Sequence, residues 1–303
     1  MWFWYALAAL LCWSGSDLFS KIGCVDSNDR CSHLKMMTAV GTVMGLHALF
    51  EIFINGVEVN LNIVLTYLPV SILYIASMAI GYLGLRYIEL SVSSPICNTS
   101  GALVAVLTVV VFGISDDITV PALLACAFSI IGVIMLGIFE ATEDEDLRRA
   151  RQEESNHQYV KSFAAIAIPI IYCLLDALGT FADSMVLERL DEDSANCAYE
   201  LTFFVVGVIC AIYVYGVKKE KFRFKEERPR YAGAVFETAG QFFYTYALAD
   251  SAHVALSAPM ISSYCAVSVI WGRIFLKEKL SKKHYTAIAI TIIGIIAMGV
   301  FDL

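Results

Sequence analysis

Residues 257–299 read SAPMISSYCAVSVIWGRIFLKEKLSKKHYTAIAITIIGIIAMG. Two apolar stretches, each near the length of about 20 residues that crosses the hydrocarbon core of a bilayer, are separated by a turn rich in lysine. The rest of the chain has the same character, because 58% of its 303 residues are hydrophobic and only 17% are charged. A soluble domain carries about 25% charged residues. The composition therefore predicts a protein that crosses a membrane several times.

The apolar stretches divide the chain into ten predicted spans and leave too few residues between them for a soluble catalytic domain. We therefore expect an all-α integral membrane protein. The ten spans are residues 2–22, 34–54, 63–87, 92–114, 120–139, 162–187, 195–217, 231–249, 253–276 and 285–301.

The distribution of Lys and Arg predicts the orientation of the chain. When the loops are numbered by the spans they join, 20 of the 21 Lys and Arg residues lie in or beside the odd-numbered loops, and Arg189 lies elsewhere. Because Lys and Arg are enriched in cytoplasmic loops, we expect the odd loops in the cytoplasm and both termini outside. Minimal loops and short termini favour a prokaryotic plasma membrane.

The motifs of enzymes and cofactor sites do not occur in the sequence. The nine cysteines are scattered and show no spacing typical of a metal site or a disulfide framework. There is no nucleotide-binding loop and no hydrolase or metalloprotease motif. We therefore expect no enzyme activity, no cofactor and no nucleic-acid partner.

Two segments indicate an internal repeat. Residues 82–95 read YLGLRYIELSVSSP and residues 246–259 read YALADSAHVALSAP, and each ends with Ser-x-Pro shortly after a span begins. We predict a first five-helix repeat at 1–139, a charged cytoplasmic linker at 140–161 and a second five-helix repeat at 162–303. An odd number of spans in each half makes the second half inverted relative to the first.

At these residues the chain resembles the EamA-type carriers of the drug/metabolite transporter superfamily. Residues 257–299 resemble the closing segment of these carriers, most clearly at 275–280 (FLKEKL), and residues 13–21 (WSGSDLFSK) fit the same pattern. The first half departs from the pattern, since it has GISDD at 113–117 in the corresponding turn. The resemblance implies ten helices, an inverted five-plus-five repeat and a central cavity between the halves.

Span 6 carries a polar stripe along one face. Tyr172, Asp176, Gly179 and Asp183 recur at helical spacing, and Asp176 lies near the centre of the span. A carboxylate at this depth costs about 2.5–3.5 kcal/mol on insertion scales, so it faces a cavity or a polar partner rather than lipid. We predict a cavity here, and the alternative is a dry helix–helix seam.

Span 8 has a second stripe. Glu237, Gln241 and Tyr244 follow one another at the same spacing, and Glu237 is central. Gln241 can donate and accept hydrogen bonds, which suits a polar solute. The alternative is an interhelical hydrogen bond that only holds helices together.

Spans 1, 4 and 9 contribute further candidates for the site. Trp13, Asp17 and Lys21 lie at i, i+4 spacing, so Asp17 either contacts substrate or pairs with Lys21. Trp13 can stack on a cation, or serve only in packing. Asn98 and Ser263 belong to polar patches at matching positions of the two halves, which fits a site at the repeat interface.

The favoured hypothesis is a secondary transporter that works by alternating access. Its expected partners are the lipid bilayer, protons as candidate coupling ions, and a small polar organic substrate that is cationic or zwitterionic. A non-transporting membrane scaffold or receptor is the second hypothesis. An intramembrane enzyme that uses Asp176 and Asp183 is the third, although their spacing puts them about 10 Å apart along one helix.

Overall fold

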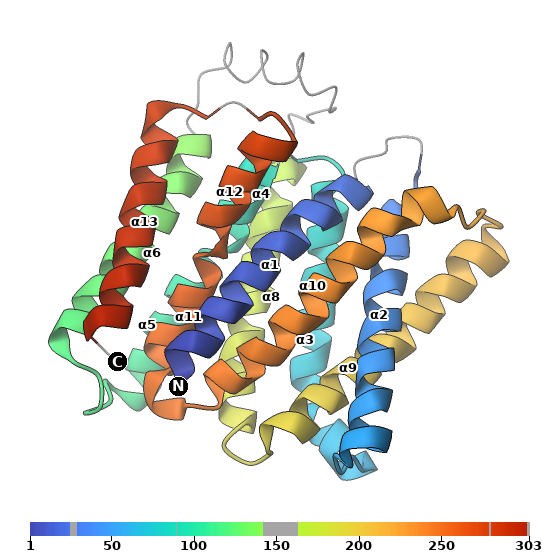
Figure 1. Cartoon of the computed structure of the whole chain (residues 1–303), viewed down its shortest axis with the longest axis horizontal. Coiled ribbons are helices and arrows are strands. Elements are labelled where there is room, and N and C mark those ends of the chain that lie inside the picture. The colour runs from blue at the N-terminus through green and yellow to red at the C-terminus, as the bar shows by residue number, and fades with distance from the viewer. Residues whose placement is uncertain (25–28, 89, 142–162, 279, 302–303) are drawn as a thin grey trace.

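A computed structural model of the chain describes residues 1–24, 29–88, 90–141, 163–278 and 280–301 (Figure 1). Beyond Ala141, the predicted linker lies outside the described residues. The helices of the described chain are α1 (Trp2–Cys24), α2 (Ser32–Phe50), α3 (Leu61–Leu85), α4 (Leu90–Cys97), α5 (Ser100–Phe112), α6 (Val120–Ala141), α8 (Phe163–Val186), α9 (Glu192–Ala211), α10 (Phe224–Leu248), α11 (Val254–Ser262), α12 (Tyr264–Phe275) and α13 (Lys282–Phe301).

Eight helical segments of the described chain are long and apolar enough to cross a membrane, which makes this a multi-pass membrane protein. They are Ser32–Asn55, Leu61–Leu85, Ser93–Phe112, Val120–Phe139, Ala167–Val186, Glu192–Val217, Ser251–Phe275 and Lys282–Phe301. The remaining two predicted spans correspond to α1 and α10, which have 23 and 25 residues. Both helices are long enough for a bilayer but carry many polar side chains. The number ten therefore stays a prediction.

Two of the predicted spans are bent rather than continuous. The first is divided into α4 and α5 at Asn98 and Thr99, and the second into α11 and α12 at Ser263. At each bend a hydroxyl donates back to its own helix, from Thr99 Oγ1 to Ile96 O at 2.8 Å and from Ser263 Oγ to Pro259 O at 2.8 Å. Such bonds compete with the backbone ladder and bend helices.

Helices of the first half pack mainly against helices of the second half. α1 lies against α10, α3 against α8, α2 against α9, and α6 against α13 (Figure 1). The bent helices also meet, because α11 packs on α5 and α12 on α4. The hydrophobic core therefore forms between the two halves.

The α2–α9 contact depends on glycine. Gly41 and Gly45 have the Gly-x-x-x-Gly spacing that lets helix backbones approach closely. A Cβ atom added at Gly41 would lie 2.7 Å from Phe203 O and 2.8 Å from Gly207 Cα. The two backbones thus touch, and no side chain larger than hydrogen fits between them.

We predict that Gly41→Leu destabilises the protein by about 1–3 kcal/mol, because a side chain at this seam forces the two backbones apart. The measurement is the thermal unfolding midpoint of the detergent-solubilised protein. Gly137→Ala is the control, since a Cβ atom there meets only Ile96 Cγ1 at 3.9 Å. Equal midpoints for the two variants would contradict the close approach of α2 and α9.

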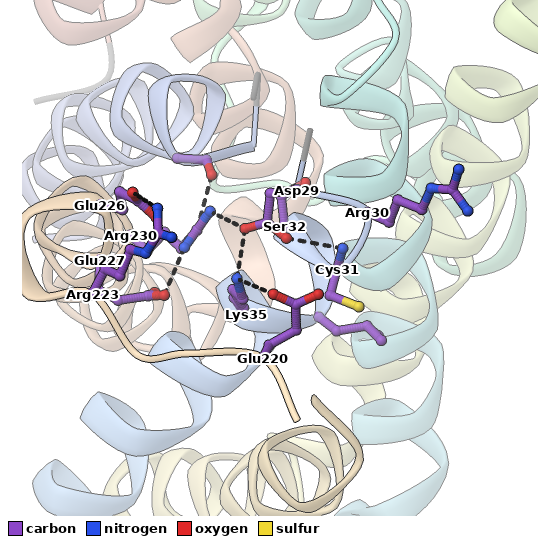
Figure 2. A network of polar contacts seen from close by, with 12 residues as sticks. Asp29, Arg30, Cys31, Ser32, Lys35, Glu220, Arg223, Glu226, Glu227 and Arg230 are labelled. Atoms are coloured by element: carbon purple, nitrogen blue, oxygen red, sulfur yellow. Dashed lines mark hydrogen bonds and ion pairs between the residues drawn. The ribbon is translucent and has the colours of Figure 1, made fainter. Parts of the chain in front are cut away.

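An ionic network connects the two halves at the end of the molecule opposite the termini (Figure 2). Asp29 Oδ2 lies 2.8 Å from Lys35 Nζ and 2.9 Å from Arg230 Nη2. Arg230 also contacts Glu227 Oε1 at 2.8 Å and donates from Nε to Gly23 O at 2.9 Å. Arg230 and Glu227 are buried, so both need these partners.

Asp29 lies between α1 and α2, outside the spans. Burial raises the pKa of Asp29, but the hydrogen bond and charge of Lys35 and the charge of Arg230 outweigh it, so this pKa is lower than usual. A carboxyl with a lowered folded-state pKa contributes stability that is fully present above its unfolded pKa of about 3.9. That stability is lost as the pH falls through the lower folded-state value.

We therefore predict that Asp29→Asn lowers the thermal midpoint at pH 7, and that the gap to the unmodified protein closes below about pH 4. Unfolding midpoints measured from neutral to acidic pH test this. Asp116→Asn, at an exposed position between α5 and α6, is the control and leaves the midpoint unchanged. A gap that stays constant over the whole pH range would show that Asp29 stabilises by packing alone.

Candidate functional site

A cavity lies between the two halves. Its empty space is about 940 Å³, a volume that includes open solvent at its mouth. Side chains from α1, α3, α4, α5, α8, α9, α10, α11 and α12 line it. The sequence-predicted residues among them are Trp13, Asp17, Asn98, Tyr172, Asp176, Glu237, Gln241 and Tyr244.

Three carboxylates line this cavity, and each accepts a hydrogen bond from a serine on a different helix. Ser16 Oγ on α1 donates to Glu237 Oε2 at 2.7 Å, and Ser100 Oγ on α5 donates to Asp176 Oδ2 at 2.7 Å.

The third pair joins α4 to α1, since Ser94 Oγ donates to Asp17 Oδ2 at 2.5 Å. These pairs hold the carboxylates at fixed positions in the wall. The described residues that line the cavity include no Lys, Arg or His, so the cavity is acidic.

Aromatic rings make up much of the remaining wall. Trp13 lies against Tyr244, with ring centroids 4.8 Å apart, and against Tyr264 at 5.9 Å. Tyr74 contacts Tyr199 and Tyr244 edge-on, at 5.8 and 6.1 Å. Rings next to carboxylates suit the binding of a cation.

Asp183 lies outside the cavity lining, about 10 Å beyond Asp176 along α8 and toward the end of the molecule that holds the termini (Figure 1). It is fully buried and accepts hydrogen bonds from Tyr67 OH at 2.6 Å and Tyr74 OH at 3.2 Å. Tyr74 also bonds to the hydroxyl of Tyr244, which donates to Thr180 Oγ1 at 2.8 Å. This tyrosine cluster closes one end of the cavity.

Ser263 also lies outside the lining. Its hydroxyl bonds to Ser129 Oγ at 2.7 Å, so it joins the bend of α11 and α12 to α6. Asn98 lines the cavity but donates from Nδ2 to Ser94 O at 2.8 Å, within the bend of α4 and α5. The polar patches of the two halves therefore serve partly to shape the bent helices.

Lys21 does not take the place that its spacing from Asp17 suggests. Its ammonium donates to Leu85 O at 2.7 Å and to Ile88 O, at the carbonyl end of α3. A cation is favoured there by the helix dipole. Asp17 instead takes its hydrogen bond from Ser94.

Several lining residues were not among the sequence candidates. They are two of the serine donors and four tyrosines: Ser16, Ser94, Tyr74, Tyr82, Tyr199 and Tyr264. The third donor, Ser100, lies outside the lining. Ser16 precedes Asp17, a predicted site residue, and Ser94 precedes Pro95 of the repeated Ser-x-Pro motif. Each serine is therefore next to a residue that the sequence had already singled out. Nothing local indicates which acid each serine contacts.

Glu278, in the charged turn at 275–280, helps to position a helix that lines the cavity. Glu278 is buried, and its Oε1 accepts from Leu90 N at 3.3 Å, at the first residue of α4. A carboxylate at a helix N-terminus is stabilised by the unpaired backbone N–H groups. The turn of the second half thus positions the first-half helix that carries Ser94.

Comparison with known sequences assigns the second half to a family. Residues 163–300, from the first residue of α8 almost to the end of α13, match the sequence profile of the EamA-like transporter family. Over these residues the chain is similar to that family. The family consists of membrane transporters of the drug/metabolite type. No curated protein sequence matches the chain.

Solved structures share the fold of this chain. One, described as "Crystal structure of protein", has a TM-score of 0.64 and 11% sequence identity, over 98% of this chain and 96% of that one. At this identity the likeness shows the fold alone.

We predict that Tyr67→Phe destabilises the protein by about 1.5–3 kcal/mol, because buried Asp183 loses its shortest hydrogen bond. Thermal unfolding of the purified protein measures the change. Tyr246→Phe is the matched control, since Tyr246 OH donates to Asp193 Oδ1 at 2.5 Å at a partly exposed site and solvent can replace it. A larger loss in the control than at Tyr67 would contradict the role given to the buried cluster.

Proposed function

We propose that this protein is a secondary transporter that carries a small polar organic metabolite, cationic or zwitterionic, by alternating access. The observation that carries the proposal is the cavity between the halves, with three carboxylates and without Lys, Arg or His among its described lining residues. The similarity to the EamA-like family supports the transporter class. Carboxylates at this depth also suit coupling to protons, or exchange of one solute for another.

The proposal includes ten crossings in two inverted repeats. Matching the halves in order pairs α1 with α8, α2 with α9, α3 with α10, α4 and α5 with α11 and α12, and α6 with α13. Under this exchange the α1–α10 contact becomes the α8–α3 contact, and the α2–α10 contact becomes the α9–α3 contact. The α2–α9 and α6–α13 contacts map onto themselves. Both bends recur in matched helices, which further supports the repeat.

We place the protein in a prokaryotic plasma membrane with both termini outside. The two termini lie at the same end of the molecule (Figure 1). The ionic network of Lys35 and Arg230 lies at the other end (Figures 1 and 2). That separation of basic residues supports a cytoplasmic position for this end.

Alternating access needs contacts that close each end in turn. The tyrosine cluster around Asp183 joins α3, α8 and α10 on the terminus side of the cavity. Asp29 and Arg230 join the halves at the opposite end. Both clusters connect helices of different halves, so rearrangement between the halves must break or remake them.

We expect Asp176→Asn and Glu237→Gln each to lower substrate flux about ten-fold or more, because each removes the charge that a cationic group requires in the cavity. The measurement is uptake of labelled primary amines and zwitterionic amino acids into proteoliposomes. Asp116→Asn, at an exposed loop position, should retain flux.

Flux that is unchanged in both cavity variants would refute the assignment of these residues. Absence of flux for the whole panel, with folded and correctly inserted protein, would refute the proposed substrate class.

A further inference from the structure

The three cavity carboxylates belong to two separate parts of the wall. Asp17 and Glu237 lie on α1 and α10, which pack against each other, and Ser16 of α1 donates to Glu237. Asp176 lies on α8 and is held to α5 by Ser100. One cavity therefore contains two acidic subsites on different helix pairs.

Each subsite can accept further hydrogen bonds. The serine bonds use one oxygen of each carboxylate, whereas an ionised carboxylate offers about four lone-pair positions. In the same cavity, the hydroxyls of Ser20 and Tyr82 are buried and have no hydrogen-bond partner among the described residues. Buried polar atoms without partners are rare in native proteins and indicate a missing ligand or water.

An ammonium group fits the first subsite. It carries three N–H donors and no acceptor. Carboxylate oxygens of Asp17 and Glu237 and the hydroxyl oxygens of Ser20 and Tyr82 supply more than three acceptors. The ring of Tyr82 adds a surface that attracts cations.

A substrate carboxylate has no equivalent place. The described lining residues include no basic side chain. The N-terminal turn of α5 reaches the cavity at Gly101, but Asp176 already lies at this positive end, where it accepts a hydrogen bond from Ser100. A zwitterion would therefore bring its negative group into an acidic cavity without a compensating charge.

Building on the proposed function, we propose that the substrate is an aliphatic diamine that spans the two acidic subsites. One ammonium group binds between Asp17 and Glu237 with the hydroxyls of Ser20 and Tyr82, and the other binds Asp176. The methylene chain between them packs against the aromatic rings of the wall, among them Tyr172 and Tyr264.

The test compares straight-chain α,ω-diamines of three to six carbons with the monoamines of the same lengths, by calorimetry on the purified full-length protein. We expect the best diamine to bind about ten-fold or more tightly than its monoamine, since a second ion pair worth about 1.4 kcal/mol gives that factor. We also expect the preference to peak at one chain length. This measurement needs no variant.

Variants then locate the two ends of the ligand. Asp176→Asn should reduce the preference for diamine over monoamine to within about two-fold. Asp17→Asn should weaken both ligands, and Asp116→Asn should change neither. Circular dichroism and the thermal midpoint establish that each variant is folded.

Equal affinity of the unmodified protein for diamines and monoamines would overturn the inference, as would an unchanged preference in folded Asp176→Asn. Tighter binding of a zwitterionic amino acid would also overturn it and would leave the transport proposal intact. Tight diamine binding without flux in proteoliposomes would refute the transport function while supporting the diamine site.

Discussion

Asp17, Asp176, Glu237 and Asp183 each accept a hydrogen bond from a donor on another helix. In a membrane no water competes for the site, so an acid without a donor costs several kcal/mol. The donors of Asp17, Asp176, Glu237 and Asp183 come from α4, α5, α1 and α3. Each bond therefore also fixes the distance between two helices. The hydrogen bonds to the carboxylates thus help to determine the shape of the cavity.

Much of the fold could be predicted from the sequence, because span length and apolar composition are local properties. Most spans match helices to within a few residues, although α10 begins seven residues before the span predicted at 231–249. The profile of the EamA-like family covers the second half. The bends were harder to predict from the sequence, because they depend on which backbone carbonyls accept hydrogen bonds from the hydroxyls of Thr99 and Ser263. The polarity of α1 and α10 follows from their position, because both line the acidic cavity.

The site could be predicted only in part. Helical periodicity placed Asp176 and Glu237 on polar faces, and the structure places both in the cavity with Asp17. Periodicity cannot separate Asp176 from Asp183, which share a stripe but differ in depth and partners. The serine donors could not be predicted from the sequence, because Ser16 and Glu237 are 221 residues apart and only tertiary packing brings them together.

The glycine seam between α2 and α9 limits how the two halves can move. At Gly41 and Gly207 the backbones touch, so neither helix can slide past the other without a clash, and little side-chain material is present to deform. A second glycine contact has the same property, because a Cβ atom added at Gly294 of α13 would lie 2.6 Å from Ser129 N of α6. The two halves are thus held at two backbone contacts, and a change in their relative position has to keep both or separate one of them.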